Sequence, residues 1–416
     1  MTLPKPVLSR REFIFLVAGL MMVDALAIDI MLPALPNIGA AFSVLHDNDR
    51  SLVVTAFLFG FGLPQIIFGP LTDRFGRRPM ILGGMAFYIA TTLAATLAPS
   101  FAILLGLRFV QGIAAAAVRV ALTASVRDQY SGKAMAEIMS LVFSVFLLVP
   151  VVMPAVGQLV LLVGPWQLIF VVMGAVALFF SVWAVLRLKE TLAKADQRPL
   201  SFKGVAAGFA LVLTNRRALF YGIAGTFLFA AVLSFILPGQ QIFGEQFGWG
   251  PYYPVAMTFI GGSAAVCSLL ASKIIGFVGV RRSAHWGAVV LPALAFGGAV
   301  LNMTVGLNAY TFLVIVMSFA LPLVTGFSSS GALSMEPLGE VAGTASAVFG
   351  LIQTIGGAFL SYLVAQSYNG TVTPILLGIG TLGLCVLSCY LIAEGGRLFG
   401  RDPEGSKGEV EAVSAF

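Results

Sequence analysis

The segment Gly69–Pro79 (GPLTDRFGRRP) constrains the fold of this chain more than any other stretch. It lies between two apolar runs, residues 51–70 and 80–97, each long enough to cross a bilayer. Three arginines and an aspartate in so short a link are costly to bury in hydrocarbon, and cytoplasmic loops are enriched in arginine and lysine. The chain is therefore expected to be a membrane protein in which this link lies on the cytoplasmic side between two helices.

Glycines and prolines suggest where these two helices end and begin. Gly69 and Pro70 are expected to close the first helix, Gly76 to form a tight turn, and Pro79 to lie in the first turn of the second helix. The ordered pattern G-x-L-x-D-R-x-G-R-R-P resembles the signature loop between helices 2 and 3 of the major facilitator superfamily. The resemblance implies a polytopic transporter. A basic turn that only obeys membrane topology would still leave a polytopic membrane protein.

The composition agrees with a chain whose main solvent is the bilayer. Of its 416 residues, 59% are hydrophobic and only 10% are charged, whereas a soluble globular protein carries about a quarter charged residues. A window of about 20 residues predicts an all-α membrane protein with twelve transmembrane helices in two six-helix bundles. The predicted helices cover residues 12–35, 51–70, 80–97, 101–125, 135–161, 167–186, 217–240, 253–273, 284–304, 310–332, 341–365 and 373–393.

The longest polar link divides the chain into four parts. Residues 1–186 are predicted to form an N-terminal six-helix bundle, 187–216 a cytoplasmic linker, 217–393 a C-terminal six-helix bundle and 394–416 a cytoplasmic tail. An even number of helices puts both chain ends on one side, and the basic residues near each end indicate the cytoplasm. The protein is expected in the bacterial inner membrane as a monomer.

The two bundles are expected to be copies of one unit. Phe75–Arg78 lines up with Val278–Arg281 half a chain later, but the second copy has Gly276 where the first has Asp73. In transporters, repeats of this kind are related by an axis along the membrane normal, and the substrate binds between them near the midplane.

Several function classes are not expected. The net charge of +6 does not indicate a nucleic-acid partner, because most of the 24 lysines and arginines fall in expected cytoplasmic segments, as membrane topology requires. The three cysteines lie within apolar runs, which supports neither a disulfide framework nor a metal site. The sequence has no nucleotide-binding loop and no hydrolase motif, so an enzyme is not expected. No cofactor is expected, only a proton gradient.

Four charged residues lie well inside predicted helices: Asp24 and Asp29 on helix 1, and Arg108 and Arg119 on helix 4. Each costs at least about 2.5 kcal/mol to insert, so each needs a partner or a function. Asp29 and Arg108 share a depth of roughly 10 Å below the outer surface, which predicts an ion pair. Asp24 lies near the midplane, and contact with Arg119 needs the full reach of the arginine. The alternatives are a static brace at the first pair and an Arg119 that extends to the inner surface.

Two motifs in the first half resemble the bicyclomycin/chloramphenicol-resistance (Bcr/CflA) type of drug:proton antiporters. They are Asp29–Pro36 (DIMLPALP) in helix 1 and Arg108–Gly112 (RFVQG) in helix 4. The resemblance implies that Arg108 takes part in proton coupling, with Asp29 as the carboxylate that is protonated from outside and deprotonated inside. Asp24 departs from that pattern and is a second candidate for the coupling carboxylate.

Helix 5 carries Pro150–Gln158 (PVVMPAVGQ), which resembles the antiporter motif of exporters in the same superfamily. Met153 and Gln158 stand where glycine is expected, and the motif favours export over uptake. The resemblance also implies a charge cluster at the signature loop that faces the start of helix 11. The residues expected to act in conformational gating are Asp73, Arg74, Arg77, Asp128, Pro150, Pro154 and Gly157.

The predicted substrate is a lipophilic, drug-like small molecule, neutral or weakly cationic, which is exchanged for protons. The expected substrate-binding residues are Asp24, Asp29, Arg119, Tyr221, Phe235 and Gln353. For the aromatic residues of helix 7, plain packing is the alternative role. His46 and His285 are not expected to form a buried proton relay. Proton-coupled uptake of a small metabolite and a non-transporting membrane receptor of the same fold are the alternative functions.

Overall fold

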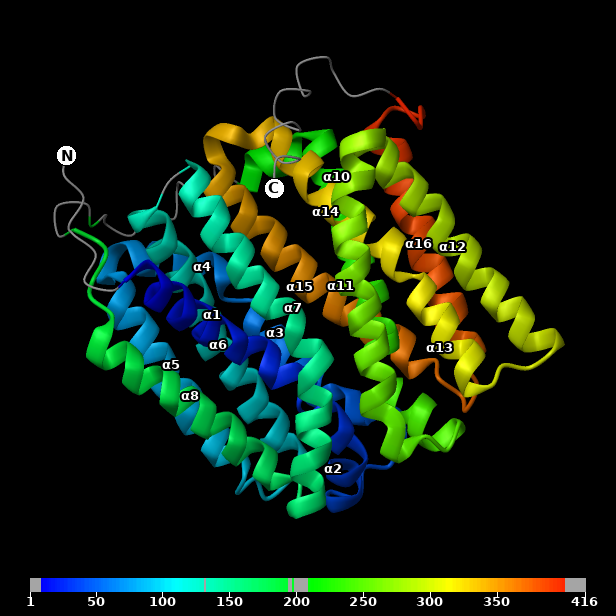
Figure 1. Cartoon of the computed structure of the whole chain (residues 1–416), viewed down its shortest axis with the longest axis horizontal. Helices are drawn as coiled ribbons and strands as arrows, with labels where there is room; N and C mark the ends of the chain where they lie inside the picture. The colour runs from blue at the N-terminus through cyan, green and yellow to red at the C-terminus, as the bar shows by residue number, and fades with distance from the viewer. Residues whose placement is uncertain (1–8, 131, 194–196, 198–208, 401–416) are drawn as a thin grey trace. The chain divides into compact units, whose positions relative to one another are not determined.

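The computed structural model describes residues 9–130, 132–193, 197 and 209–400. These residues form helices and no strand (Figure 1), which confirms the all-α prediction. The chain divides into two compact units, Met1–Gly204 and Val205–Phe416, which we describe separately. The middle of the predicted linker and most of the predicted C-terminal tail lie outside the described residues.

The first unit carries all four of the charges singled out within membrane helices. Its helices are α1 (Arg10–Asp29), η1 (Leu32–Ala34), α2 (Leu35–Ala41), η2 (Asp47–Ser51), α3 (Leu52–Gly62), α4 (Gln65–Phe75), α5 (Arg77–Ala95), α6 (Phe101–Gln129), α7 (Gly132–Val163) and α8 (Gln167–Arg187). α6 packs against α3, α5 and α1, and α1 also packs against α7 and α8. The helix with the two aspartates is thus a direct neighbour of the helix with the two arginines.

The second unit repeats the arrangement of membrane-length helices. Its elements are α10 (Arg216–Ile236), η4 (Gln241–Gln246), η5 (Gly250–Tyr252), α11 (Tyr253–Val278), α12 (Val280–Thr304), α13 (Ala309–Ser318), α14 (Ala320–Met335), η6 (Glu336–Val341), α15 (Ala342–Gln366) and α16 (Thr373–Ala393). α10 packs against α14, α15 and α16, and α12 packs against α14 and α16. α14 and α16 therefore each contact both α10 and α12.

The helices account for the predicted membrane spans. Within the part of the chain that the structure describes, nine helical segments are long and apolar enough to cross a bilayer. The pair Asp47–Gly62 and Gln65–Phe75, bent by 47°, adds a tenth. The two remaining predicted spans are also helical: α5 begins with two arginines, and α7 contains the apolar stretch Leu148–Val163. The chain is therefore a multi-pass membrane protein, and the described part of each unit has helices at all six of its predicted spans.

Two helices end at places that differ from the prediction. Helix 1 stops at Asp29 and resumes as η1 and α2, because Pro33 lacks the backbone N–H that would continue the helical pattern. The expectation that Gly69 and Pro70 close the second helix is wrong. α4 continues through Pro70 and ends at Phe75, with Gly76 as its C-cap, since a proline removes one hydrogen bond and bends a helix without having to end it.

The same turn precedes the third long helix of each unit. Gly76 has φ +96° and ψ 162°, and Gly279 has φ +96° and ψ 156°. Residues other than glycine rarely adopt this backbone region. The matching geometry supports the internal duplication that the sequence alignment predicted.

Replacing Gly76 by alanine is expected to destabilise the first unit. The new Cβ would lie 2.5 Å from Oε2 of Glu190, and this backbone region costs other residues about 1–3 kcal/mol. We expect a lower midpoint in thermal unfolding of the purified protein in detergent. Gly83→Ala is the matched control, because open space surrounds the corresponding Cβ position within α5. Equal midpoints for the two variants would contradict this account of the turn.

Candidate functional site

Arg108 is fully buried in the first unit and binds groups on three helices. Its Nε donates to the carbonyl oxygen of Val53 at 3.0 Å, and its Nη2 donates to that of Ala27 at 2.7 Å. Its Nη1 donates to Oε1 of Gln111 at 2.5 Å. The guanidinium also lies over the ring of Phe57, 4.8 Å from the ring centroid. Arg108 therefore joins α6 to α1 and α3 through uncharged groups.

The ion pair predicted between Asp29 and Arg108 is not formed, so that prediction is wrong for this structure. The reason lies in the backbone of helix 1. There the N–H of Met31 bonds to the carbonyl oxygen of Ile28 and leaves the carbonyl of Ala27 without its α-helical donor. In a membrane-spanning segment such a carbonyl needs a donor from the protein, and Arg108 supplies it.

Asp29 is left as an isolated carboxylate at the break in helix 1. It is the last residue of α1 and only 5% exposed. Among the residues that the structure describes, its side chain makes no hydrogen bond or ion pair. The carbonyl oxygen of the next residue, Ile30, lies 2.2 Å from where a Cβ on Gly157 of α7 would be, so only glycine allows this approach. The break is therefore packed directly against the motif of helix 5.

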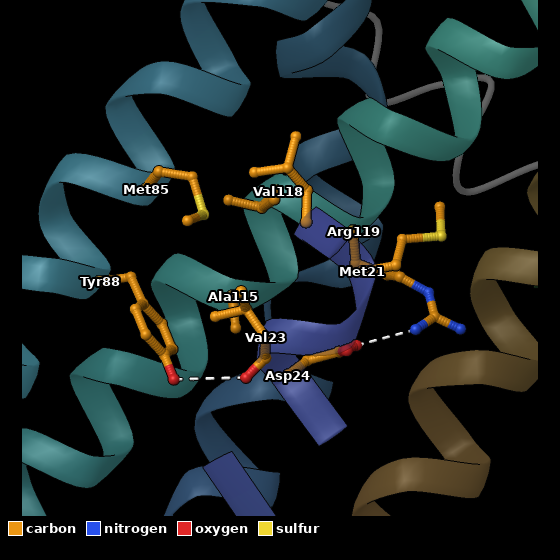
Figure 2. A pocket seen from close by; sticks show the side chains of 9 residues that line it. Met21, Val23, Asp24, Met85, Tyr88, Ala115, Val118 and Arg119 are labelled. Atoms are coloured by element: carbon orange, nitrogen blue, oxygen red, sulfur yellow. Dashed lines mark hydrogen bonds and ion pairs between the residues drawn. The ribbon is translucent and has the colours of Figure 1, made fainter. Parts of the chain in front are cut away.

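The second acid of helix 1 lies in a small pocket of the first unit (Figure 2). Oδ2 of Asp24 accepts a hydrogen bond from Nη1 of Arg119 at 2.8 Å, and its Oδ1 accepts the backbone N–H of Ala25 at 2.9 Å. The hydroxyl of Tyr88 donates to the carbonyl oxygen of Val23 at 3.3 Å. Arg119 thus reaches Asp24, as its length allows.

Apolar and aromatic side chains line the rest of this pocket. They are Leu20, Met21, Met85, Tyr88, Ala115 and Val118. The pocket is narrow: its empty volume of about 220 Å³ includes open solvent, and the side chains around it are buried. In this conformation it is too small to enclose a drug-sized ligand.

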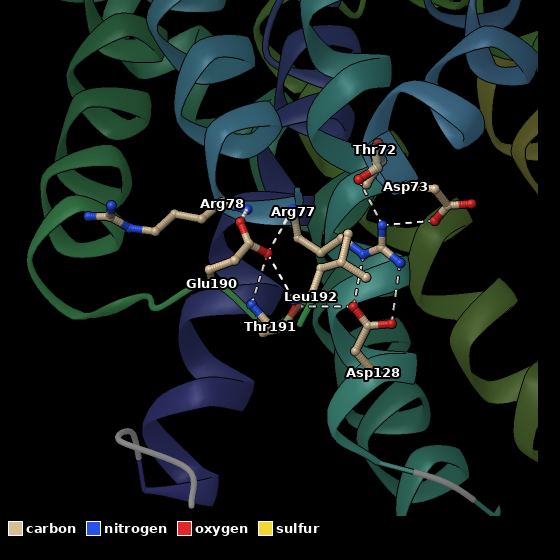
Figure 3. A network of polar contacts seen from close by, with 8 residues as sticks. All are labelled: Thr72, Asp73, Arg77, Arg78, Asp128, Glu190, Thr191 and Leu192. Carbon is tan, nitrogen blue, oxygen red and sulfur yellow. Dashed lines mark hydrogen bonds and ion pairs between the residues drawn. The ribbon is translucent and has the colours of Figure 1, made fainter. Parts of the chain in front are cut away.

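The signature loop forms a charge cluster around the buried guanidinium of Arg77 (Figure 3). Nη1 of Arg77 lies 2.8 Å from Oδ1 of Asp73 and donates to the carbonyl oxygen of Thr72 at 2.8 Å. Its Nε donates to Oδ2 of Asp128 at 2.8 Å, and the hydroxyl of Thr191 donates to the same oxygen at 3.1 Å. The cluster joins the adjoining ends of α4, α5 and α6, while the side chain of Asp73 remains 41% exposed.

Glu190, which the sequence analysis missed, holds the same loop. Its carboxylate accepts the backbone N–H of Arg77 at 2.9 Å and of Arg78 at 3.1 Å. These are the first two residues of α5, whose N–H groups have no acceptor within the helix. Arg78 in turn donates to the carbonyl oxygens of Leu188 at 2.7 Å and Val185 at 2.9 Å. The only sequence signal for this contact was the presence of an acid shortly after the sixth helix. The backbone N–H group of Arg77 that it binds lies 113 residues earlier.

The remaining residues of the predicted gating set lie apart from this cluster. Arg74 is exposed, and its guanidinium lies 5.6 Å from the ring centroid of Phe75. Pro150 and Pro154 lie inside α7, which continues through both. The predicted gating residues that the structure brings together are Asp73, Arg77 and Asp128.

Tyr221, predicted to bind substrate, belongs instead to a polar cluster of the second unit. Its hydroxyl donates to Oε1 of Glu394 at 2.9 Å, and Glu394 also pairs with Arg217 at 3.0 Å and Arg281 at 3.8 Å. Tyr221 is only 1% exposed, so its ring is not open to a ligand. His285, expected to lie outside any buried relay, is fully buried with Nε2 3.4 Å from the Tyr221 hydroxyl. Burial of His285 was not expected, because Arg281 and Arg282 lie close to it in the sequence.

The other two predicted substrate contacts lie on α10 and α15. Phe235 of α10 is buried. Gln353 of α15 is half-buried, with Nε2 3.0 Å from where a Cβ on Gly225 of α10 would lie. Gln353 therefore lies at the packing contact between these two helices.

The sequence is similar to transporters over most of its length. A sequence model of the Major Facilitator Superfamily matches residues 17–361. A bicyclomycin resistance protein homolog of Haemophilus influenzae is 28% identical over 386 residues, which cover 91% of this chain and 94% of the relative. The multidrug transporter MdfA of Yersinia pestis is 30% identical over 354 residues, which cover 80% of this chain and 83% of the relative.

The fold is also that of a solved transporter. The crystal structure of a D-xylose–proton symporter matches with a TM-score of 0.73 at 13% identity, over 92% of this chain and 97% of the symporter. At this level of identity, the likeness concerns the fold and not the substrate.

Arg108 and Asp29 are expected to differ in their importance for stability. Arg108→Lys replaces five N–H donors in a planar group by a point charge. At least one of the three buried acceptors then loses its donor, at a cost of about 1–3 kcal/mol. Asp29→Asn removes no described contact and should keep the thermal midpoint in detergent near that of the wild type. A large loss of stability in Asp29→Asn would instead support the static brace.

Proposed function

This chain belongs to the Major Facilitator Superfamily, as its signature loop predicted, and we propose that it exports a lipophilic, drug-like molecule in exchange for protons. It is a membrane transporter and not an enzyme. The relatives named as a bicyclomycin resistance homolog and a multidrug transporter support a drug-like substrate here. We also propose that it acts as a monomer in the bacterial inner membrane, with both chain ends in the cytoplasm.

The isolated carboxylate of Asp29 is the observation that carries this proposal. A buried carboxylate without a counter-charge is costly to keep ionised within a membrane-spanning helix. No described cation pairs with Asp29, so binding a proton is the way in which its charge would be neutralised. We propose that Asp29 takes up a proton from the outside and releases it on the inside.

Arg108 supports this role by positioning the site. It binds the carbonyl oxygens of Ala27 and Val53, and so holds the backbone just before the break that carries Asp29. We therefore propose Arg108 as a positioning residue for the proton site and not as the ion-pair partner of Asp29. Asp24, whose charge is compensated by Arg119, is proposed to face the substrate.

The motif of helix 5 supports export and links it to the proton site. Gly157 lies against the carbonyl oxygen of Ile30, the residue that follows Asp29. A movement of α7 would therefore act on the backbone at the proton site, which is what coupling between conformation and protonation requires.

Asp29→Asn is expected to fold and to bind drug but to lose the release of protons on drug addition. A pH indicator in weakly buffered, purified protein measures this release, with a drug chosen from the resistance profile that the protein confers on a drug-hypersensitive host. Asp24→Asn, five residues earlier in α1, is the matched variant and should keep proton release. The reverse result would assign the coupling role to Asp24.

The direction of transport is tested with vesicles of opposite orientation. Accumulation of the drug in energised inside-out vesicles supports export. Accumulation in right-side-out vesicles would instead support proton-coupled uptake, and accumulation in neither would support the receptor alternative.

We propose that Asp73 acts in the conformational step of transport. Its Oδ1 lies 2.8 Å from Nη1 of Arg77, and its side chain stays 41% exposed. Asp128 holds the same guanidinium with both oxygens, at 2.8 and 3.4 Å. Arg77 would therefore stay bonded to Asp128 if its contact with Asp73 were broken. Asp73 could then change partners without displacing Arg77.

Asp73→Asn is expected to lower the rate of drug transport in vesicles by about tenfold or more, which corresponds to roughly 1.4 kcal/mol in the barrier. Its equilibrium drug affinity and thermal midpoint should stay near those of the wild type. Asp128→Asn is the contrasting variant, because its amide keeps only one of the two oxygens that accept from Arg77 and removes the negative charge, so it should also lower the midpoint. Wild-type turnover in Asp73→Asn would contradict the gating role.

A further inference from the structure

We propose that residues 394–399 form a strap that closes one end of the second unit, with Phe399 as a lid over the buried imidazole of His285. The strap follows α16 at the red end of the colour scale (Figure 1). It is closed in this structure, and its opening would bring the imidazole into contact with solvent. This inference concerns the second unit alone and does not depend on the export function proposed above.

The base of the strap is Glu394, the residue that follows α16. Its side chain is only 10% exposed, and its Oε2 pairs with Nη2 of Arg217 at 3.0 Å. Its Oε1 accepts a hydrogen bond from the hydroxyl of Tyr221 at 2.9 Å and lies 3.8 Å from Nε of Arg281. These contacts fix the start of the strap to α10 and α12.

Two glycines follow the base and turn the chain away from α16. Gly395 has φ +65° and Gly396 has φ +83°, in the left-handed region that glycine adopts readily. Their N–H groups donate to the carbonyl oxygens of Ile392 at 3.3 Å and Leu391 at 2.8 Å, which closes the last turn of α16. Adjacent glycines between a fixed base and a docked tip can absorb the backbone rotation of a hinge.

The tip of the strap docks on α12 through Phe399. The backbone N–H of Phe399 donates to Nδ1 of His285 at 2.9 Å. Its ring packs edge-on against the imidazole, with 5.7 Å between the ring centroids, and its centroid lies 5.1 Å from that of Trp286. His285 is fully buried, although it lies in only the second turn of α12. The lid thus lies over an imidazole whose Nε2 is 3.4 Å from the hydroxyl of Tyr221.

The backbone of the tip indicates that the lid can open. Phe399 has φ +62°, a region that bulky residues rarely adopt, so its contacts with α12 hold a strained conformation in place. The residue is still 37% exposed, and its neighbour Trp286 is 56% exposed. A strained and partly exposed segment beside a glycine hinge is expected to open locally while the helices stay folded.

The two histidines of the chain allow a direct test. His46 is exposed at the start of η2 and serves as the internal reference. Diethyl pyrocarbonate acylates accessible imidazoles, and peptide mass spectrometry gives the rate at each histidine in the purified protein in detergent. In the wild type, His285 is expected to react about tenfold or more slowly than His46, and Phe399→Ala should raise the ratio of the two rates about fivefold or more.

Two further variants are matched controls. Phe399→Tyr keeps the ring and the backbone N–H, so it should keep the wild-type ratio. Phe277→Ala removes a 93% exposed ring near the end of α11 in the same unit, and it should also leave the ratio unchanged. An unchanged ratio in Phe399→Ala, an equal rise in Phe277→Ala, or equal rates at the two histidines of the wild type would each overturn the proposal.

Hydrogen exchange of the wild-type protein tests the opening without any variant. The backbone N–H of Phe399 should exchange about tenfold or more slowly than in an unstructured peptide, because it is bonded to His285. It should exchange faster than the N–H groups in the middle of α12. Exchange as slow as in the middle of α12 would make the strap a permanent part of the fold, and exchange at the unstructured rate would mean that it is not closed. Either result would contradict a lid that opens and closes.

Discussion

Hydrogen bonding of the backbone within the membrane is the constraint on which the first unit depends. A helix in lipid has to satisfy its own N–H and C=O groups, because no water is present to do so. Helix 1 breaks this pattern at Asp29, and Arg108 compensates by donating to the carbonyl oxygen of Ala27 while it also binds Val53 of α3. One side chain thus joins three helices and allows an interruption that would otherwise leave polar groups unsatisfied. At the interruption, the carbonyl oxygen of Ile30 packs closely against Gly157 of α7.

The sequence located the charged residues inside membrane helices but was a poorer guide to what they contact. Charged residues within apolar runs are easily recognised, since insertion into lipid makes each of them costly. A shared depth in the membrane predicted that Arg108 pairs with Asp29, which is not observed. Arg119 was expected to reach Asp24 only at the full reach of its side chain, and that contact is observed. Depth locates a side chain along the axis but says nothing of backbone acceptors nearby. Those acceptors appear only when the ends of helix 1 are known.

Local sequence patterns did not predict the contacts between segments that are distant in the chain. Turn chemistry predicted the glycine turn at Gly76, yet the carboxylate that caps the next helix comes from Glu190, in the segment that follows α8. In the same way, the buried contact of His285 with Tyr221 joins α12 to α10 across 64 residues. Such pairs depend on how helices pack, which hydropathy and spacing do not specify. The twelve-helix architecture needed no such information, because a bilayer sets the length and polarity of each span.

Arg108 of α6 and Asp29 of α1 have different roles at the break in helix 1, and this has a consequence for how such transporters diversify. Arg108 serves three buried acceptors, so few replacements preserve the fold. Asp29 serves none among the described residues, so an acid at this place can be lost or moved along the helix with little effect on folding. Under the proton-coupling role proposed for Asp29, a lineage built on this scaffold can change the number and location of its ion-binding acids while its architecture is inherited unchanged. Selection on that proposed role and selection on foldability then act on different side chains.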